Sequence, residues 1–145
     1  MGGEGIGAGK NGERRAKVER FEDLVAWQRA RNLTRTVYDL TRREPLARNF
    51  GLVSQVQRAA VSIMSNIAEG FERGGRAEFH QFLSTAKASC AEVRSLLYVL
   101  VDAGYIDRAT FERLLAETEE LGRIVGGLRA AVGRQRDQPA PAKSR

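Results

Sequence analysis

The chain has 145 residues, a net charge of +6 and a pI near 10.1, and its length suits one domain with a buried core. No apolar run approaches the length of about 18 residues that a membrane span requires, and the N-terminus lacks the apolar core of a signal peptide. Cys90 is the only cysteine, which excludes an internal disulfide and fits a reducing compartment. We therefore expect a cytoplasmic protein that has no membrane contact.

The positive charge lies at the two ends of the chain. Residues 1–20 carry a net charge of +2 and residues 129–145 carry +4, whereas residues 21–128 hold 14 charges of each sign. The start is rich in glycine, and the end turns to Pro, Ala, Lys and Arg after residue 133. We predict a disordered basic arm at 1–20, a folded domain at 21–133 and a disordered basic tail at 134–145. Basic tails attract phosphate backbones without reading sequence; the alternative is that their charge is incidental.

Apolar periodicity predicts a first helix over about 22–43 and a second over about 47–72. The first ends before Pro45, which cannot continue a helix, and the second ends near Gly74 and Gly75. The expected buried positions of the first are Trp27, Ala30, Leu33, Val37, Tyr38, Leu40 and Thr41. Those of the second are Leu52, Val56, Ala59, Ala60, Ile63 and Ile67.

The third predicted helix covers about 76–103 and ends at Gly104, and Asp107 caps the fourth. The third places Phe79, Phe82, Leu83, Ala86, Cys90, Val93, Leu97 and Leu100 on one side. The fourth carries Phe111, Leu114, Thr118, Leu121, Val125, Leu128 and Val132 at alternating steps of three and four. This spacing is typical of helices that pack at about 20°. Short connections between long helices predict an all-α, antiparallel up-down-up-down four-helix bundle.

A polar stripe follows the second predicted helix, opposite its apolar arc. It consists of Gln55, Arg58, Ser62, Ser65, Asn66 and Glu69. Surface helices usually fill this side with Lys and Glu, whereas here most of the side chains are short hydrogen-bonding groups. The stripe therefore favours contact with another polypeptide, and the alternative is an ordinary solvated face. Whether the contact is made within the bundle or between protomers stays open.

The sequence has no cluster of side chains of the kind that catalysis or metal binding requires. The chain has one histidine, His80, and one cysteine, Cys90. Because Cys90 lies on the predicted apolar face, we interpret it as a small core residue. Glu69 and Glu78 lack the Glu-x-x-His pairing of di-iron bundles. We expect no catalytic residue, no metal and no cofactor, and an enzyme that uses Glu69 or His80 is the least favoured hypothesis.

Two rows of basic side chains are candidate nucleic-acid contacts. Arg31, Arg35 and Arg42 lie along the first predicted helix, and Arg76, Lys87 and Arg94 lie along the third. Arginine forks match phosphate geometry, but few exposed aromatic residues lie among them for stacking on bases. These rows therefore favour contact with the nucleic-acid backbone over readout of the base sequence, and the alternative is a solvated rim or a protein contact.

The charges are also unequal between two halves of the domain. Residues 24–76 hold nine Arg and four acidic residues, whereas residues 77–128 hold five basic and eight acidic residues. A basic half and an acidic half attract head to tail, and such contacts form a ring when the rotation closes.

Several short blocks carry a resemblance to a known family. They are Phe21-Glu-Asp-Leu-Val-Ala-Trp27-Gln, Tyr38-Asp-Leu-Thr41, Pro45, Gly51-Leu52, Gln55, Arg58-Ala-Ala-Val-Ser62, Asn66-Ile-Ala-Glu-Gly70, Ser89-Cys-Ala-Glu92 and Leu121-Gly122. In this order they resemble the 23S rRNA intervening-sequence protein family, also called four-helix bundle proteins, over about Phe21 to Val132. One position departs, because the family usually has an acidic residue three places after the proline, where this chain has Arg48.

The resemblance implies self-assembly. Characterised family members look like homopentameric rings of four-helix bundles, so we expect a homo-oligomer, a pentamer, with the signature residues at an interface. Those residues are Gln55, Arg58, Ser62, Asn66, Glu69 and Gly70. Similar barrel-shaped bundles serve diversity-generating retroelements as accessory proteins that bind nucleic acid and a reverse transcriptase.

These observations lead to two functional hypotheses. The first is a non-catalytic homo-oligomer that binds the RNA or DNA backbone without sequence specificity as an accessory factor, with a reverse transcriptase or another protein as a further partner. The alternative is a protein-interaction scaffold that has no nucleic-acid role and whose basic tails are incidental.

Overall fold

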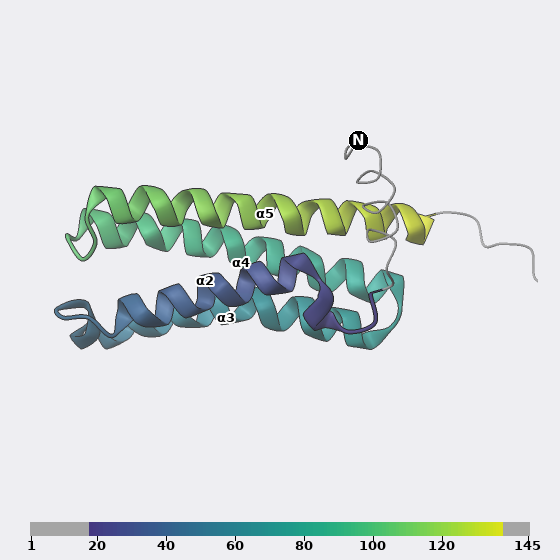
Figure 1. Cartoon of the computed structure of the whole chain (residues 1–145), viewed down its shortest axis with the longest axis horizontal. Helices are drawn as coiled ribbons and strands as arrows, with labels where there is room; N and C mark the ends of the chain where they lie inside the picture. The colour runs from purple at the N-terminus through teal and green to yellow at the C-terminus, as the bar shows by residue number, and fades with distance from the viewer. Residues whose placement is uncertain (1–17, 138–145) are drawn as a thin grey trace, which may run out of the picture.

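The computed structural model describes residues 18–137, which form an antiparallel four-helix bundle. The elements are η1 (Phe21–Asp23), α2 (Val25–Thr41), η2 (Leu46–Arg48), α3 (Phe50–Arg73), α4 (Arg76–Asp102) and α5 (Arg108–Asp137). Figure 1 shows that each long helix runs opposite to the one before it, with α2 beside α3 and α4 beside α5. Helix α4 packs along both α3 and α5, while α2 packs chiefly against α3. The all-α bundle predicted from the apolar periodicity is therefore present in the described part of the chain.

Helix α2 begins at Val25, later than the predicted start at residue 22. Before it, residues 21–23 form a 3-10 turn, in which the backbone N–H groups of Glu19 and Arg20 each donate to Asp23 Oδ2 at 3.3 Å. Phe21 packs edge-on against Trp27, with ring centroids 5.2 Å apart. The aromatic contact and the Asp23 hydrogen bonds together fix a turn at positions that periodicity alone assigned to the helix.

The second predicted start was also too early. Residues 46–48 form a 3-10 turn after Pro45, and α3 begins at Phe50. The side chain of Asn49 accepts a hydrogen bond from the backbone N–H of Leu52 at 3.2 Å, which caps the helix. The other boundaries follow the sequence signals more closely, since Gly74 and Gly104 follow α3 and α4 with φ of 83°.

Asp107 caps α5, as predicted, by accepting the Thr110 backbone N–H at 2.8 Å. Helix α5 continues to Asp137, so the predicted domain limit at residue 133 and tail start at 134 were placed too early. Nothing interrupts the helix at Gly133, which is buried rather than placed as a C-terminal cap. The rest of the predicted tail, and most of the arm at 1–20, lie outside the described residues.

The core follows the predicted stripes. In α5, the residues at steps of three and four are buried, apart from a partly exposed Leu128. Thr118 is fully buried, and its hydroxyl donates to the Leu114 carbonyl oxygen at 2.7 Å, which satisfies the polar group inside the core. Tyr38 was wrongly predicted as buried: it is 37% exposed, because Val37 occupies the core-facing position. Trp27 is half-buried.

Candidate protein and nucleic-acid interfaces

Part of the polar stripe closes α3 onto α4 within one protomer. The hydroxyl oxygens of Ser62 and Ser89 lie 2.8 Å apart. Asn66 Nδ2 donates to the backbone oxygen of Ser62 at 2.8 Å and to its hydroxyl oxygen at 3.0 Å. Since Ser89 is buried, this network satisfies polar groups at the helix interface. Ser62 and Asn66, two of the predicted interface residues, therefore contact their own bundle.

Gly70 has a steric role at the same helix pair. A Cβ added at Gly70 would lie 2.6 Å from the Phe82 Cβ and 3.0 Å from Phe79 Cδ1. No ordinary side chain fits there unless α3 and α4 move apart. Glu69, its neighbour in the signature, is exposed and forms an ion pair with Arg73 at 3.5 Å. Arg73 also pairs with Glu78 at 3.7 Å, so Glu69 belongs to a surface ion-pair group at this end of the bundle.

The remaining signature residues, Gln55 and Arg58, point outward. Together with Glu92 of α4 they line a groove of about 440 Å³ whose floor includes Ser62. Within residues 18–137, these three side chains make no hydrogen bond or ion pair. This surface therefore offers a second polypeptide three polar groups without partners in the described residues, namely the Arg58 guanidinium, the Gln55 amide and the Glu92 carboxylate.

An apolar groove adjoins this surface on the α2 side of α3. It has a volume of about 500 Å³ and is lined by Tyr38, Phe50, Val53, Ser54, Gln57, Arg58, Val61 and Ser62. Phe50 is 77% exposed, and the sequence reasoning did not identify it. Phe50 lies outside the apolar arc of the second predicted helix, and this position could have identified it as a surface residue. An aromatic side chain at an exposed position has no core to fill. Arg58 and Ser62 line both grooves, so the two surfaces are continuous.

The basic row of α2 is partly engaged by its own helix. The Arg31 guanidinium lies over the Trp27 ring, 5.8 Å from its centroid, and Arg42 forms an ion pair with Asp39. Arg35 donates to the Asn32 side-chain oxygen at 3.4 Å, so within the described residues it lacks an acidic partner. All three are exposed, but Asp39 offsets one of the three charges.

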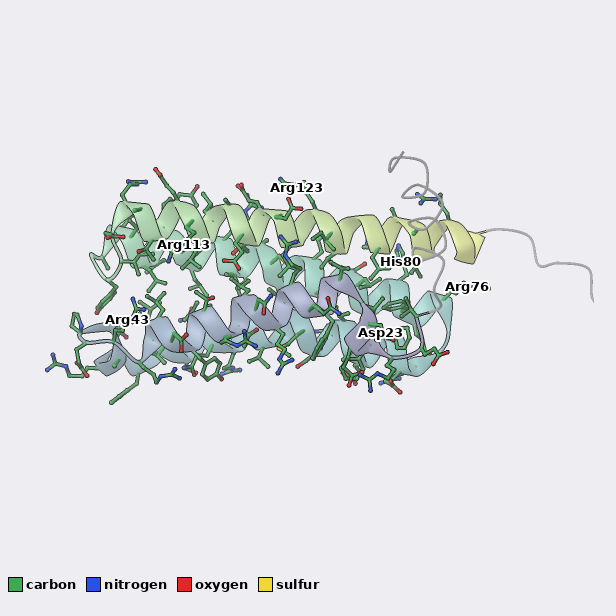
Figure 2. All side chains as sticks on the ribbon, in the orientation of Figure 1. Asp23, Arg43, Arg76, His80, Arg113 and Arg123 are labelled. Atoms are coloured by element: carbon green, nitrogen blue, oxygen red, sulfur yellow. The ribbon has the colours of Figure 1, made fainter. Side chains whose placement is uncertain are left out.

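The basic row of α4 does not form one surface. Arg76 is the first residue of α4 and lies about 16 Å along the helix axis from Lys87. Figure 2 shows Arg76 at the end of the bundle near the connection between α3 and α4. Lys87 and Arg94, in contrast, both line a groove of about 460 Å³ between α4 and α5. The structure therefore brings two of the three predicted residues together.

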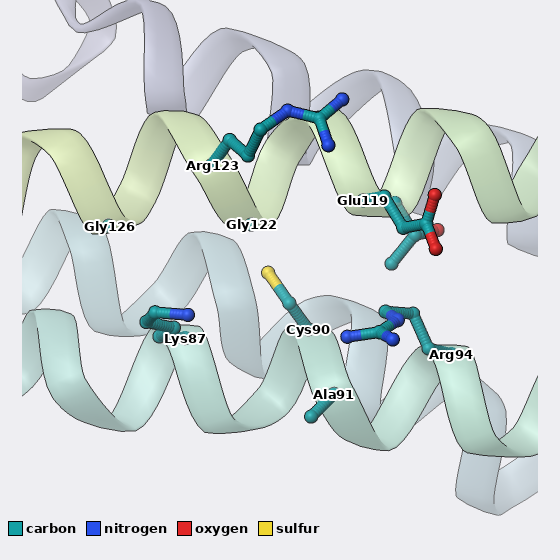
Figure 3. Close-up of a pocket in the computed structure, with 9 residues that line it drawn as sticks. Lys87, Cys90, Ala91, Arg94, Glu119, Gly122, Arg123 and Gly126 are labelled. Atoms are coloured by element: carbon teal, nitrogen blue, oxygen red, sulfur yellow. The ribbon is translucent and has the colours of Figure 1, made fainter.

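Helix α5 supplies the other wall of this groove, as Figure 3 shows. Gly122, Arg123 and Gly126 lie along that wall, and sequence reasoning missed all three as groove residues. Cys90 lies at the floor and is 2% exposed. Burial raises the pKa of its thiol to about 11, against the opposing effect of Lys87 and Arg94. The thiol therefore stays protonated near neutral pH and is no nucleophile.

The described residues contain no group of three or more His, Cys, Asp and Glu side chains placed to hold a metal ion. His80 is half-buried beside α5, where a Cβ added at Gly133 would lie 3.2 Å from His80 Cδ2. Among residues 18–137, no helix is long and apolar enough to cross a membrane.

Comparison with known proteins gives a family and a structural neighbour. The family model described as 23S rRNA-intervening sequence protein matches residues 22–127. A solved structure of a protein of unknown function from the S23 ribosomal protein family of Bacteroides thetaiotaomicron VPI-5482 is similar, with a TM-score of 0.68 and 20% identity. The match covers 73% of this chain and 96% of that chain, and at this identity it shows the fold alone. No curated protein matches the sequence.

Proposed function

Because the chain belongs to the 23S rRNA-intervening sequence protein family, we propose that it is a non-catalytic, homo-oligomeric bundle that binds the backbone of RNA or DNA as an accessory factor. The observation that carries the nucleic-acid part is the groove between α4 and α5, where Lys87 and Arg94 lie together without acidic partners among the described residues. Positive charge without base-stacking aromatic residues suits contact with phosphates rather than with bases.

The continuous surface on α3 supports self-assembly. Phe50 and the adjoining apolar groove would lose contact with water in a complex, while Gln55, Arg58 and Glu92 supply polar groups for specificity. The basic half of one protomer would face the acidic half of the next, and we propose that these head-to-tail contacts close into a ring of five protomers. The single cysteine supports a cytoplasmic location.

One observation favours the alternative, a protein-interaction scaffold without a nucleic-acid role. The row on α2 is partly engaged by its own helix, since Arg42 pairs with Asp39 and Arg31 stacks on Trp27. In that alternative, the α3 surface binds a protein partner, and the net charge at the chain ends has no function.

A salt-dependent titration of full-length protein with labelled RNA separates the two. Fluorescence anisotropy at about 50 and 200 mM salt should show binding that weakens steeply at the higher concentration, because phosphate contacts release counterions. Changing all six Lys and Arg residues of 1–17 and 138–145 to Gln in the full chain tests the ends separately. If this variant still binds RNA, the contact lies on the bundle, and if it does not, the contact lies at the chain ends. If the wild-type chain itself does not bind RNA, the scaffold alternative is supported.

A further inference from the structure

Lys87 and Arg94 both line the groove between α4 and α5. They are seven residues apart on the same helix, so their Cα atoms are separated by about 10 Å along its axis. Figure 3 shows the Lys87 amino group and the Arg94 guanidinium on either side of Cys90, each extending toward the other. Neither cation has an ion-pair partner within residues 18–137. Two like charges that point toward each other leave a position between them where an anion is attracted by both.

The α5 wall leaves this position open. Gly122 and Gly126 are four residues apart and both line the groove. A Cβ at Gly122 would lie 3.9 Å from the Cys90 Cβ, which is ordinary contact, so packing of α4 on α5 does not require glycine there. A Cβ at Gly126 would lie 3.3 Å from Lys87 Cε and would press on the lysine stem. Glycine inside a helix costs about 1 kcal/mol relative to alanine, so two on one wall favour a role that needs the space.

The net charge of the groove suits a phosphate group. Its lining holds three basic residues, Lys87, Arg94 and Arg123, and one acid, Glu119. Arg123 also pairs with Glu120 at 2.9 Å, so it contributes less than the other two. The Cys90 thiol at the floor is neutral and adds no negative charge. By comparison, the groove between α3 and α4 offers one basic and one acidic residue, Arg58 and Glu92, and has no comparable excess of positive charge.

We propose that the groove between α4 and α5 is a phosphate-binding site in which Lys87 and Arg94 hold the anion from both sides and Arg123 contributes at the rim. This inference rests on the proposed function where it names the source of the phosphate as the backbone of RNA or DNA. The same chemistry would also accept a free phosphate compound, so the test includes both sources.

The test uses full-length protein and two kinds of groove variant. Lys87→Gln with Arg94→Gln removes the charges, whereas Gly122→Leu fills the space and leaves the charges in place. The matched control is Arg43→Gln with Arg113→Gln, which removes the same charge at two exposed positions outside the groove and outside both basic rows. Labelled RNA is titrated by anisotropy at several salt concentrations, and pyrophosphate is titrated by calorimetry. Circular dichroism and thermal unfolding establish that each variant is folded.

We expect both groove variants to weaken RNA binding about tenfold, and the charge variant to reduce the salt slope by about 2, since each phosphate contact contributes about 1. The control variant should change affinity by less than threefold. RNA binding that is unchanged in folded groove variants would overturn the site and leave the nucleic-acid function standing. A third outcome is that wild type binds pyrophosphate but not RNA, and that the groove variants lose the pyrophosphate binding. This result would keep the groove as a site for small phosphate compounds and would reject the proposed function. If neither probe binds wild type, both proposals fail.

Discussion

Gly70 of α3 faces Phe82 of α4 so closely that an added Cβ at Gly70 would lie 2.6 Å from the Phe82 Cβ. The contact is with an atom fixed to the α4 backbone, so no rotation of the Phe82 side chain relieves it. Gly70→Ala should therefore lower the free energy of unfolding by about 1–3 kcal/mol, as overpacking does in other cores. Urea unfolding followed by circular dichroism measures the change.

Gly127→Ala is the matched control for that substitution. Gly127 is exposed inside α5, and an added Cβ there would meet no atom within 4 Å. The alanine should stabilise the helix by about 0.5–1 kcal/mol, because glycine has more backbone freedom to lose on folding. Equal effects at Gly70 and Gly127 would contradict the close approach of α3 and α4.

The sequence predicted the helices and their buried stripes because a repeat of three and four residues is a property of each segment alone. The predictions of helix starts and burial were wrong where contacts with another part of the chain determine the structure. Tyr38 lies at the edge of the α2 stripe, and whether it is covered depends on how α3 sits beside it. The 3-10 turns before Val25 and Phe50 depend on contacts of Phe21 and on the Asn49 cap, which periodicity does not record.

The sequence predicted those parts of the candidate sites that lie on one helix and not those that depend on how two helices pack. Lys87 and Arg94 share a face of one helix, so their proximity follows from sequence spacing. Arg123, Gly122 and Gly126 join them only through the register of α5 against α4, and a single sequence does not give that register. Likewise, Ser62 appeared in the polar stripe, but its hydrogen bond to Ser89 required the position of α4.

The Ser62–Ser89 hydrogen bond should stabilise the fold and not the assembly. Ser62→Ala leaves the Ser89 hydroxyl without its hydrogen-bond partner, whereas Ser89→Ala leaves Ser62 bonded to Asn66. The two substitutions should couple by about 0.5–1.5 kcal/mol in a double-mutant cycle. Ser95→Ala is the control, since Ser95 is exposed on α4 and makes no hydrogen bond among the described residues. A change in oligomer mass at constant stability would show instead that these serines face a second protomer.

Phe50→Asp should weaken self-assembly without unfolding the bundle. Phe50 is the first residue of α3, where an acidic side chain is favourable near the positive end of the helix dipole. Light scattering should therefore show a lower mass, or a dissociation constant raised at least tenfold, at unchanged helicity. Val25→Asp is the matched control, because Val25 is the first residue of α2 and is 55% exposed. Wild-type mass for Phe50→Asp would remove the apolar groove from the assembly surface.

Cys90 should report on opening of the groove between α4 and α5. Burial raises the pKa of its thiol from 9.0 to about 11. At pH 8 a thiol reagent should therefore react with the native chain at least tenfold more slowly than with the unfolded chain, in which the thiolate is more abundant. Comparable rates in the two states would contradict burial of the thiol.

The raised pKa of Cys90 also fixes the sign of a stability effect. The folded state favours the protonated thiol, so this group stabilises the fold fully below pH 9.0 and progressively less as pH rises toward 11. The stability of wild type relative to Cys90→Ala should therefore fall between about pH 8 and pH 10, where the unfolded thiol ionises first. Urea unfolding of both chains at each pH measures this difference, in which titration of other groups cancels. A constant difference across that range would mean that the folded thiol ionises as readily as the unfolded one.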